Sequence, residues 1–306
     1  MSDTPNARKV IVTGASGLVG TVLCNNLADS GWQVIRAVRR PAQSPDEVMW
    51  NPQTGDIDKA GFEGAAAVVH LAGENIADSR WSESFKQKIL HSRTQGTLLI
   101  AETLAALDAK PEVLVCASAI GYYGDRGDEV MTEASPPDDD FLADVCVQWE
   151  AACQPARDAG IRTVNTRIGV VQSPKGGALA KMLTPFKLGA GGVLGSGEQY
   201  ISWIALEDVA RGLQFAVETP GLSGPVNLVA PNPVTNREFT KTLGRVLGRP
   251  TIFPVPAFAA KLAFGEMAEA LLLASTRVAP TALEAAGFEF QHRQLEPALR
   301  HLLGKS

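Results

Sequence analysis

The segment with the most distinctive chemistry is a glycine-rich turn near the start of the chain, Gly14-Ala15-Ser16-Gly17-Leu18-Val19-Gly20. It follows an apolar run, Lys9–Thr13, and opens a stretch with helical periodicity, Leu18–Ser30. The three glycines permit a tight turn, close approach of a diphosphate to the backbone and close packing of the helix. Free N–H groups at the start of the helix then hold the anion. The turn predicts a dinucleotide-binding site; the alternative is a merely tight strand-to-helix turn.

The end of the second predicted strand, Gln33–Val38, indicates which dinucleotide to expect. NAD-binding proteins usually place Asp or Glu there to hold the ribose 2′-hydroxyl, whereas this chain continues Arg39-Arg40-Pro41. A guanidinium binds a 2′-phosphate in bidentate fashion, and a carboxylate would repel it. We therefore expect NADP(H) in preference to NAD(H), with Arg39 as the main ligand and Arg40 or Arg36 as helpers. The alternative for the two helpers is that they are solvated surface charges.

The elements that must position this site alternate between strands and helices over the first 230 residues. This alternation predicts an α/β protein with a Rossmann-type, doubly wound parallel sheet. We expect residues 1–234 to form the dinucleotide-binding domain and residues 235–306 to form a small, mostly helical substrate-side lobe. Further strands are expected at Val48–Trp50, Ala67–Leu71, Glu112–Ala117 and Arg162–Arg167, and long helices at Glu83–Leu107 and Phe141–Ala159.

Composition excludes several classes of protein. The 306 residues carry a net charge of −5, so no nucleic-acid or anionic-membrane partner is expected. No apolar stretch approaches the ~18 residues that span a bilayer, and the polar start does not resemble a signal peptide, so a cytoplasmic protein is expected. Because the four cysteines form no CxxC pair and no metal-ligand spacing, we expect reduced core cysteines and no metal site. A monomer or homodimer acting on a small molecule fits this composition.

Short motifs along the whole chain carry a family resemblance. The broader ones are the glycine turn, His70-Leu71-Ala72-Gly73, Tyr122-Tyr123-Gly124-Asp125 and Trp203–Ala210, and the narrower ones are Asn75-Ile76, Ser92-Arg93, Ser118–Gly124 and Trp149-Glu150. Together they resemble an extended short-chain dehydrogenase/reductase of the atypical, NAD-dependent epimerase/dehydratase type. Segments of the tail, including Phe264-Gly265-Glu266 and Ala286-Gly287-Phe288, resemble the family's C-terminal domain of unknown function.

The resemblance implies chemistry that this chain does not carry in the usual form. Ordinary members use a Tyr-x-x-x-Lys pair on a helix, in which the lysine prepares the tyrosine to exchange a proton during hydride transfer. The corresponding helix here, Phe141–Glu150, contains neither residue. Counting back from Glu150 places Leu142 and Cys146 at the two positions. The usual serine position falls on Ala119, and Ser118 lies one residue away.

Two neighbouring tyrosines are the candidates to replace the missing proton donor. Tyr122 and Tyr123 follow the fifth strand, near the place where the nicotinamide is expected. Either one, or a water molecule, could handle the proton if a cation stabilised the phenolate. The alternative is that both rings form the wall of the pocket, with satisfied hydroxyl groups.

Three cationic residues are further candidates for the site. Arg93 stands where ordinary members carry an asparagine, so the resemblance implies contact with cofactor or substrate. Lys88 lies five residues earlier on the same helix and could also reach the cofactor. Arg167 ends the sixth strand, beside the crevice where ligands bind in open α/β sheets. Each has an ordinary alternative: a helix-surface charge for Arg93 and Lys88, and a structural ion pair for Arg167.

The remaining candidates line either the cofactor or the substrate. Small residues in Leu71-Ala72-Gly73 would let the backbone approach the cofactor ribose, and Asp56-Ile57 could face the adenine or form a plain loop. A second glycine cluster, Gly189–Gly197, follows a helix and predicts a mobile loop near the substrate. Asn75, Gln199 and Trp203 are candidates for substrate binding, although Trp203 could equally lie in the core.

Two functions from different classes are consistent with these residues. The first is an oxidoreductase or epimerase that moves hydride between an unknown small molecule and the nicotinamide. The second is a non-catalytic NADP(H)-binding sensor or scaffold, which the missing tyrosine and lysine favour. A third hypothesis is an interaction protein that uses the apolar tail, Phe258–Ala274, as a partner surface.

Overall fold

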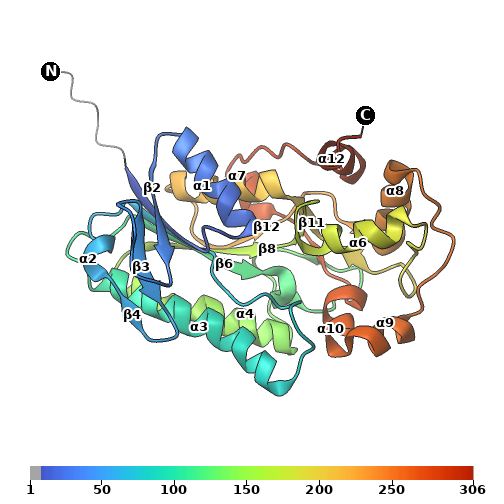
Figure 1. Ribbon diagram of the computed structural model, residues 1–306, viewed down its shortest axis with the longest axis horizontal. Helices are drawn as coiled ribbons and strands as arrows, with labels where there is room; N and C mark the ends of the chain where they lie inside the picture. The colour runs from blue at the N-terminus through green and yellow to red at the C-terminus, as the bar shows by residue number, and fades with distance from the viewer. Residues whose placement is uncertain (1–7, 306) are drawn as a thin grey trace.

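The computed structural model describes residues 8–305 and contains an eight-stranded sheet with helices on both faces (Figure 1). The strands run in the order β12-β8-β6-β5-β1-β2-β3-β4, and every neighbouring pair is parallel except β3 and β4. The doubly wound Rossmann-type sheet predicted from the sequence is confirmed. The strands of this sheet are β1 (Lys9–Thr13), β2 (Gln33–Val38), β3 (Glu47–Asn51), β4 (Asp56–Ile57), β5 (Ala67–His70), β6 (Val113–Ala119), β8 (Arg162–Ile168) and β12 (Gly224–Leu228).

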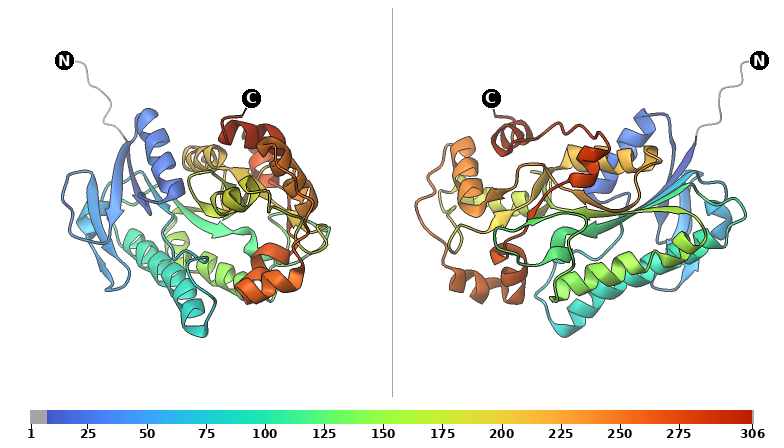
Figure 2. Two further views of the ribbon diagram at one scale, coloured as in Figure 1. Left: turned by 45° about the vertical axis from the view of Figure 1, so that its right-hand side comes forward. Right: turned by 180° about the vertical axis from the view of Figure 1, so that it is seen from behind.

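Two apolar layers hold the helices against the sheet, and alternate residues of each central strand enter opposite layers. Val10 and Val12 of β1 pack with the helices α1 (Leu18–Asp29) and α7 (Leu206–Glu218). Ile11, between them, enters the other layer. Figure 2 shows the helices on the two faces of the sheet from two further directions. The second layer contains α3 (Glu83–Ala105), α4 (Phe141–Ala151) and α5 (Gln154–Asp158).

The strand order reverses between β1 and β5, and this reversal places the candidate site. Thr13 at the end of β1 pairs in register with His70 at the end of β5. The glycine turn therefore begins beside the loop that follows β5. In open α/β sheets, ligands bind outside the carboxyl ends of the strands at this kind of switch point.

The C-terminal part of the chain packs on both the sheet and its own helices. Trp203 and Phe239 lie in a core shared by α6 (Gly177–Lys187), α8 (Asn236–Leu247) and α12 (Leu295–Leu302), whereas Leu283 of α11 (Thr281–Ala285) packs in the α1–α7 layer. The helices α9 (Ala257–Phe264) and α10 (Glu266–Ala268) and the π-helix η2 (Glu269–Leu273) follow one another. The remaining elements are α2 (Lys59–Phe62), the 3-10 helix η1 (Ile120–Tyr123), β7 (Val130–Met131), β9 (Val170–Gln172), β10 (Tyr200–Ile201), β11 (Trp203–Ala205), β13 (Val234–Thr235) and β14 (Arg277–Val278).

Two sequence predictions about elements need correction. The single helix expected over Phe141–Ala159 is broken into α4 and α5. Pro155 lies in the first turn of α5, and a proline in the interior of one long helix would lose a hydrogen bond and collide with an earlier carbonyl. Of the two alternatives for Asp56–Ile57, the plain loop is wrong, because this segment forms β4, which pairs antiparallel with β3. Within residues 8–305, no helix is both long enough and apolar enough to cross a bilayer.

Candidate functional site

A cavity of about 950 Å³ lies between the glycine turn and the loops that follow β2 and β5. This volume is within the range of small-molecule and cofactor sites. Ten of the residues proposed from the sequence line it: Gly14, Ser16, Gly17, Arg36, Arg39, Arg40, Leu71, Ala72, Gly73 and Lys88. The sequence did not predict the part of the lining that is formed by Glu47, Trp50, Pro52, Gln53, His91, Ser92 and Gln95.

The glycines of the turn stand where a side chain would collide with backbone. Gly14 adopts φ +67°, and a Cβ there would lie 3.0 Å from the carbonyl carbon of Leu71. A Cβ at Gly20 would lie 2.1 Å from the carbonyl oxygen of Gly14. Gly17 is the N-cap of α1, and no side chain caps the helix. The N–H groups of the first turn, which have no partner within a helix, are therefore available to an anion.

Thr13, which sequence reasoning missed, fixes the other side of this turn. Its hydroxyl oxygen accepts hydrogen bonds from the backbone N–H groups of Leu71 (3.1 Å) and Ala72 (3.3 Å). The same hydroxyl lies 2.7 Å from Nδ1 of His70. Because both lone pairs are used, the hydroxyl donates to Nδ1, and the neutral ring carries its proton on Nε2. Burial lowers the pKa of His70 to about 4, which keeps the ring neutral near pH 7.

The four lysine and arginine side chains that line the cavity divide into two pairs. Arg36 forms an ion pair with Asp46 at 2.7 Å. Arg40 makes two hydrogen bonds to Glu47, at 2.7 and 2.8 Å, and these hold the pKa of Glu47 at about 2. In contrast, Arg39 and Lys88 make no hydrogen bond or ion pair with any residue of the described range 8–305 and are exposed. These two cations remain available to an anionic ligand.

Arg93 lies outside the cavity lining and holds the loop after β5 against α3. Its guanidinium donates to the carbonyl oxygens of Ile89 (3.1 Å) and Glu74 (3.0 Å). It also stacks over the ring of Trp149, with 5.0 Å between the guanidinium carbon and the ring centroid. This placement gives Arg93 a role in shaping the loop, and contact with cofactor or substrate stays a prediction.

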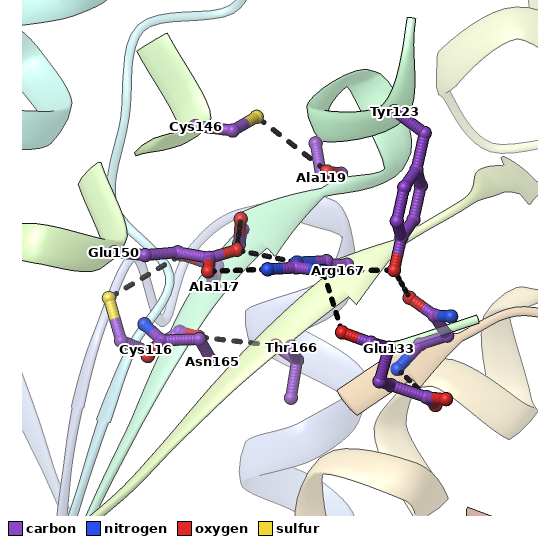
Figure 3. Close-up of polar contacts among 12 residues, drawn as sticks. Cys116, Ala117, Ala119, Tyr123, Glu133, Cys146, Glu150, Asn165, Thr166 and Arg167 are labelled. Atoms are coloured by element: carbon purple, nitrogen blue, oxygen red, sulfur yellow. Dashed lines mark hydrogen bonds and ion pairs between the residues drawn. The ribbon is translucent and has the colours of Figure 1, made fainter. Parts of the chain in front are cut away.

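Arg167 is the centre of a buried polar network at the ends of β6 and β8 (Figure 3). Its side chain is 3% exposed and makes two hydrogen bonds to the carboxylate of Glu150, at 2.8 and 2.9 Å. Glu150 also accepts a hydrogen bond from the hydroxyl of Ser118 at 2.7 Å. Of the two roles considered for Arg167, a substrate clamp or a structural ion pair, this geometry favours the ion pair. Ser118 is likewise buried, with its hydroxyl engaged.

The two candidate tyrosines have opposite environments, although their rings lie edge to face at 5.3 Å. Tyr123 is fully buried, donates to Oδ1 of Asn227 (2.7 Å) and accepts from Arg167 (3.0 Å). Burial raises its pKa to about 12. Tyr122 is only partly buried, and its hydroxyl has no hydrogen-bond partner within residues 8–305. Neither tyrosine lines the cavity, so a role in the reaction stays a prediction for Tyr122, whereas the geometry favours a structural role for Tyr123.

The positions that the resemblance assigns to the missing tyrosine and lysine are buried and hold no group that could replace them. Leu142 and Cys146 lie on α4, and both are buried. The Cys146 thiol donates to the carbonyl oxygen of Ala119 at 3.6 Å, and burial raises its pKa to about 12. A neutral, buried thiol does not act as a nucleophile or a general base. Neither residue replaces the proton relay of ordinary family members.

The three residues proposed for substrate binding lie outside the cavity lining. Asn75 bonds locally to Asp78 and to the backbone N–H of Ala77. Gln199 is buried and donates to the carbonyl oxygens of Leu194 and Leu272, so it ties the second glycine cluster to the C-terminal tail. Trp203 is fully buried, which matches its alternative placement in the core, and its indole N–H donates to the carbonyl of Asn232 at 2.9 Å.

Comparison with known families identifies the group of proteins to which this arrangement belongs. The sequence model described as the NAD dependent epimerase/dehydratase family matches residues 10–228. The chain belongs to this family. A second match, to a domain of unknown function, covers residues 255–302. Both matches confirm the family resemblance inferred from the motifs, including that of the tail.

Relatives match the chain over nearly its whole length. The epimerase family protein Mb2239 of Mycobacterium bovis is 47% identical over 290 residues, which is 95% of this chain and 96% of that protein. The crystal structure of human epimerase family protein SDR39U1 with NADPH has a TM-score of 0.90 and 34% identity, covering 97% and 99% of the two chains. The nucleoside-diphosphate sugar epimerase of Corynebacterium glutamicum has a TM-score of 0.81 and 38% identity, covering 98% of this chain and 59% of that one.

Proposed function

We propose that the chain is an NADP(H)-binding oxidoreductase or epimerase that acts on a small molecule. The observation that carries this proposal is the exposed guanidinium of Arg39, which has no partner among residues 8–305 and lies in a cavity built on the glycine turn. A 2′-phosphate needs such a cation, and the nearby carboxylates of Glu47 and Asp46 are each neutralised by their own arginine. The NADPH named with the human relative supports the same cofactor class.

The residues of the cavity fit the parts of a dinucleotide. The N–H groups at the start of α1 would hold the diphosphate, because Gly14 and Gly17 leave the backbone bare there. Arg39 would hold the 2′-phosphate, and Lys88 adds a second cation to the lining of the cavity. When bound, the nicotinamide supplies a hydride acceptor or donor. Tyr122 would exchange the accompanying proton, since its hydroxyl is the accessible one of the adjacent pair.

Replacing Arg39 tests the cofactor assignment. We expect Arg39→Ala to raise the Kd for NADPH by about tenfold or more and to leave the Kd for NADH within about twofold, because only NADPH carries the 2′-phosphate. Isothermal titration calorimetry of both coenzymes measures the two values. Arg249→Ala removes an exposed cation just beyond the end of α8 and serves as the control for a general charge effect. Equal losses for NADPH and NADH in Arg39→Ala would refute the 2′-phosphate assignment.

A non-catalytic NADP(H) sensor is the second candidate, and the closed network around Arg167 favours it. The hydroxyls of Ser118 and Tyr123 are both committed to partners within the protein. Absorbance of NADPH with a panel of carbonyl compounds and nucleotide sugars separates the two functions. Turnover that falls about a hundredfold in Tyr122→Phe supports the enzyme. Tight NADPH binding without turnover across the panel supports the sensor.

A further inference from the structure

Hydrogen bonds hold all three nitrogens of the Arg167 guanidinium and leave its faces for other contacts. Nε and Nη2 donate to the two oxygens of Glu150, and Nη1 donates to the hydroxyl of Tyr123 at 3.0 Å. Nη1 also lies 3.5 Å from the carbonyl oxygen of Glu133. These bonds come from several elements around the group, so the plane of the guanidinium has a set orientation (Figure 3).

The ring of Tyr122 lies against that face. The guanidinium carbon is 3.4 Å from the ring centroid of Tyr122, compared with 5.2 Å for the ring of Tyr123. Arginine stacks on aromatic faces because its flat, weakly hydrated cation is attracted by the π-electrons of the ring. Arg167 therefore contacts both tyrosines: it donates a hydrogen bond to Tyr123, and the face of its guanidinium stacks on the ring of Tyr122.

The two tyrosines also restrain one another. Their rings meet edge to face at 80°, so Tyr122 is bounded by Arg167 on its face and by Tyr123 at its side. The hydroxyl end of Tyr122 has no partner within residues 8–305. Helix η1, which carries it, directly follows β6, and β6 pairs with β5 at the edge of the sheet where the cavity opens. The restrained ring thus carries a hydroxyl without a partner in the described residues, at the sheet edge where the cavity opens but outside the residues that line the cavity.

We propose that Arg167 is a positioning residue for Tyr122, whose ring it holds so that the phenol faces the reacting end of the site. This assignment rests on the proposed function, in which Tyr122 exchanges the proton. In ordinary family members, the lysine of the Tyr-x-x-x-Lys pair assists the tyrosine. Here α4 lacks both residues, and the cation that contacts Tyr122 is Arg167 on β8. Glu150 acts indirectly, because its carboxylate sets the plane on which Tyr122 rests.

The proposal requires an arginine and not merely a positive charge at position 167. A lysine can pair with Glu150, but its ammonium group has no plane on which a ring can stack and cannot make the bidentate contact. Arg167→Lys therefore separates the two properties. We expect this variant to keep the ion pair and the fold and to release the ring of Tyr122.

Tyrosine NMR reads the ring directly, because the chain has only three tyrosines. With ¹³C-labelled tyrosine, Tyr122→Phe assigns the signals of position 122. In Arg167→Lys, we expect the Tyr122 ring signals to shift and ring flipping to accelerate, while the signals of Tyr200 stay in place. The matched control is Arg277→Lys, because Arg277 lies 4.7 Å from the centroid of Tyr200. That control should move the signals of Tyr200 and leave those of Tyr122 unchanged.

Cofactor binding and turnover complete the test. NADPH affinity in Arg167→Lys should stay within about twofold of wild type, and kcat for any substrate found in the panel should fall about tenfold with little change in KM. If Arg167→Lys does not fold, Arg167→Gln combined with Glu150→Gln removes both charges and is measured in the same way. Unchanged Tyr122 signals in a folded variant would overturn the proposal. Failure of wild type to bind NADPH would overturn the proposed function instead, and the NMR result on the free protein would still decide the role of Arg167.

Discussion

The cavity at the glycine turn and the network around Arg167 lie at the same edge of the sheet. They differ in whether their polar groups have hydrogen-bond or ion-pair partners within the protein. At the turn, α1 begins without a capping side chain, and Arg39 and Lys88 make no contact with a carboxylate in residues 8–305. Around Arg167, all three nitrogens of the guanidinium donate to acceptors, and the hydroxyls of Ser118 and Tyr123 are also hydrogen-bonded.

This difference distinguishes a ligand site from a support. Polar groups that a protein buries are nearly always paired internally, whereas a binding site keeps its polar groups for the ligand. By that criterion the turn has the properties of an anion-binding site, and the network around Arg167 has those of a structural element. Tyr122 lies on the boundary, because its ring rests on the network and its hydroxyl is free. Four measurements test this division.

The largest effect is expected from breaking the buried network. Arg167→Gln leaves the carboxylate of Glu150 without its cation in a largely buried place, so we expect a loss of about 3–5 kcal/mol in the free energy of unfolding. Urea denaturation measures it. Adding Glu150→Gln removes the unpaired charge and should recover most of the loss. A single variant as stable as wild type would show that the network is not a support.

The buried histidine beside the turn should make stability depend on pH. His70 has a pKa of about 4 in the folded protein, against about 6.5 in an unfolded chain. Between these two pKa values, only the unfolded chain binds the proton. The contribution of the neutral His70 to the free energy of unfolding is therefore complete above pH 6.5 and is lost as the pH falls toward 4. The loss should reach about 3 kcal/mol at the lower value. Urea denaturation between pH 7.5 and 4.5 measures it.

A variant isolates that single group from other titrating residues. His70→Asn keeps an acceptor for the Thr13 hydroxyl and removes the imidazole, so its unfolding free energy should change less with pH than that of wild type. His91→Asn, at an exposed position, should follow wild type. Identical pH slopes for wild type and His70→Asn would contradict the assignment of the effect to His70.

Filling the turn should impair the cavity more than it impairs the fold. Gly20→Ala places a Cβ 2.1 Å from the carbonyl oxygen of Gly14, so the turn must move. We expect NADPH binding to weaken about tenfold or more, with a stability loss of about 1–3 kcal/mol. Gly221→Ala is the control, because its Cβ would meet no atom within 4 Å. Normal NADPH affinity in Gly20→Ala would show that the turn does not hold the diphosphate.

The smallest effect on NADPH affinity is expected from Arg40, the arginine of the cavity that is paired with Glu47. Arg40 already gives both of its terminal nitrogens to Glu47, so Arg40→Ala should change the Kd for NADPH within about threefold. Arg39→Ala, one residue earlier, should have the larger effect described above. Titration calorimetry of the two variants side by side compares a committed and a free guanidinium. The reverse ranking would mean that the ion pair opens when the cofactor binds.

Much of the fold followed from local patterns in the chain. The bounds of β1 and β2 match the prediction, and α1 ends one residue earlier than predicted. Alternating burial and helical periodicity are properties of neighbouring residues, so a single sequence reveals them. The break between α4 and α5 was missed, although Pro155 was visible in the sequence and could have indicated it.

The candidate site was predictable only in part. The glycine turn could be recognised because its requirements, a positive φ at Gly14 and no side chain at Gly20, belong to a short segment. The role of Thr13 could not be predicted, because its hydroxyl bonds to the loop after β5, which is distant in the sequence. The wall of the cavity around Trp50 comes from β3 and α3, whose approach no local pattern reveals.

The sequence by itself determined the family, the class of sheet and the glycine turn, because the motifs and periodicities behind them belong to short segments of the chain. Only the tertiary structure decided which arginine is free and which tyrosine is accessible. Those properties depend on partners far apart in sequence, such as Tyr123 with Asn227 and Arg167 with Glu150. A charge or a hydroxyl is available to a ligand only when folding has brought no internal partner to it.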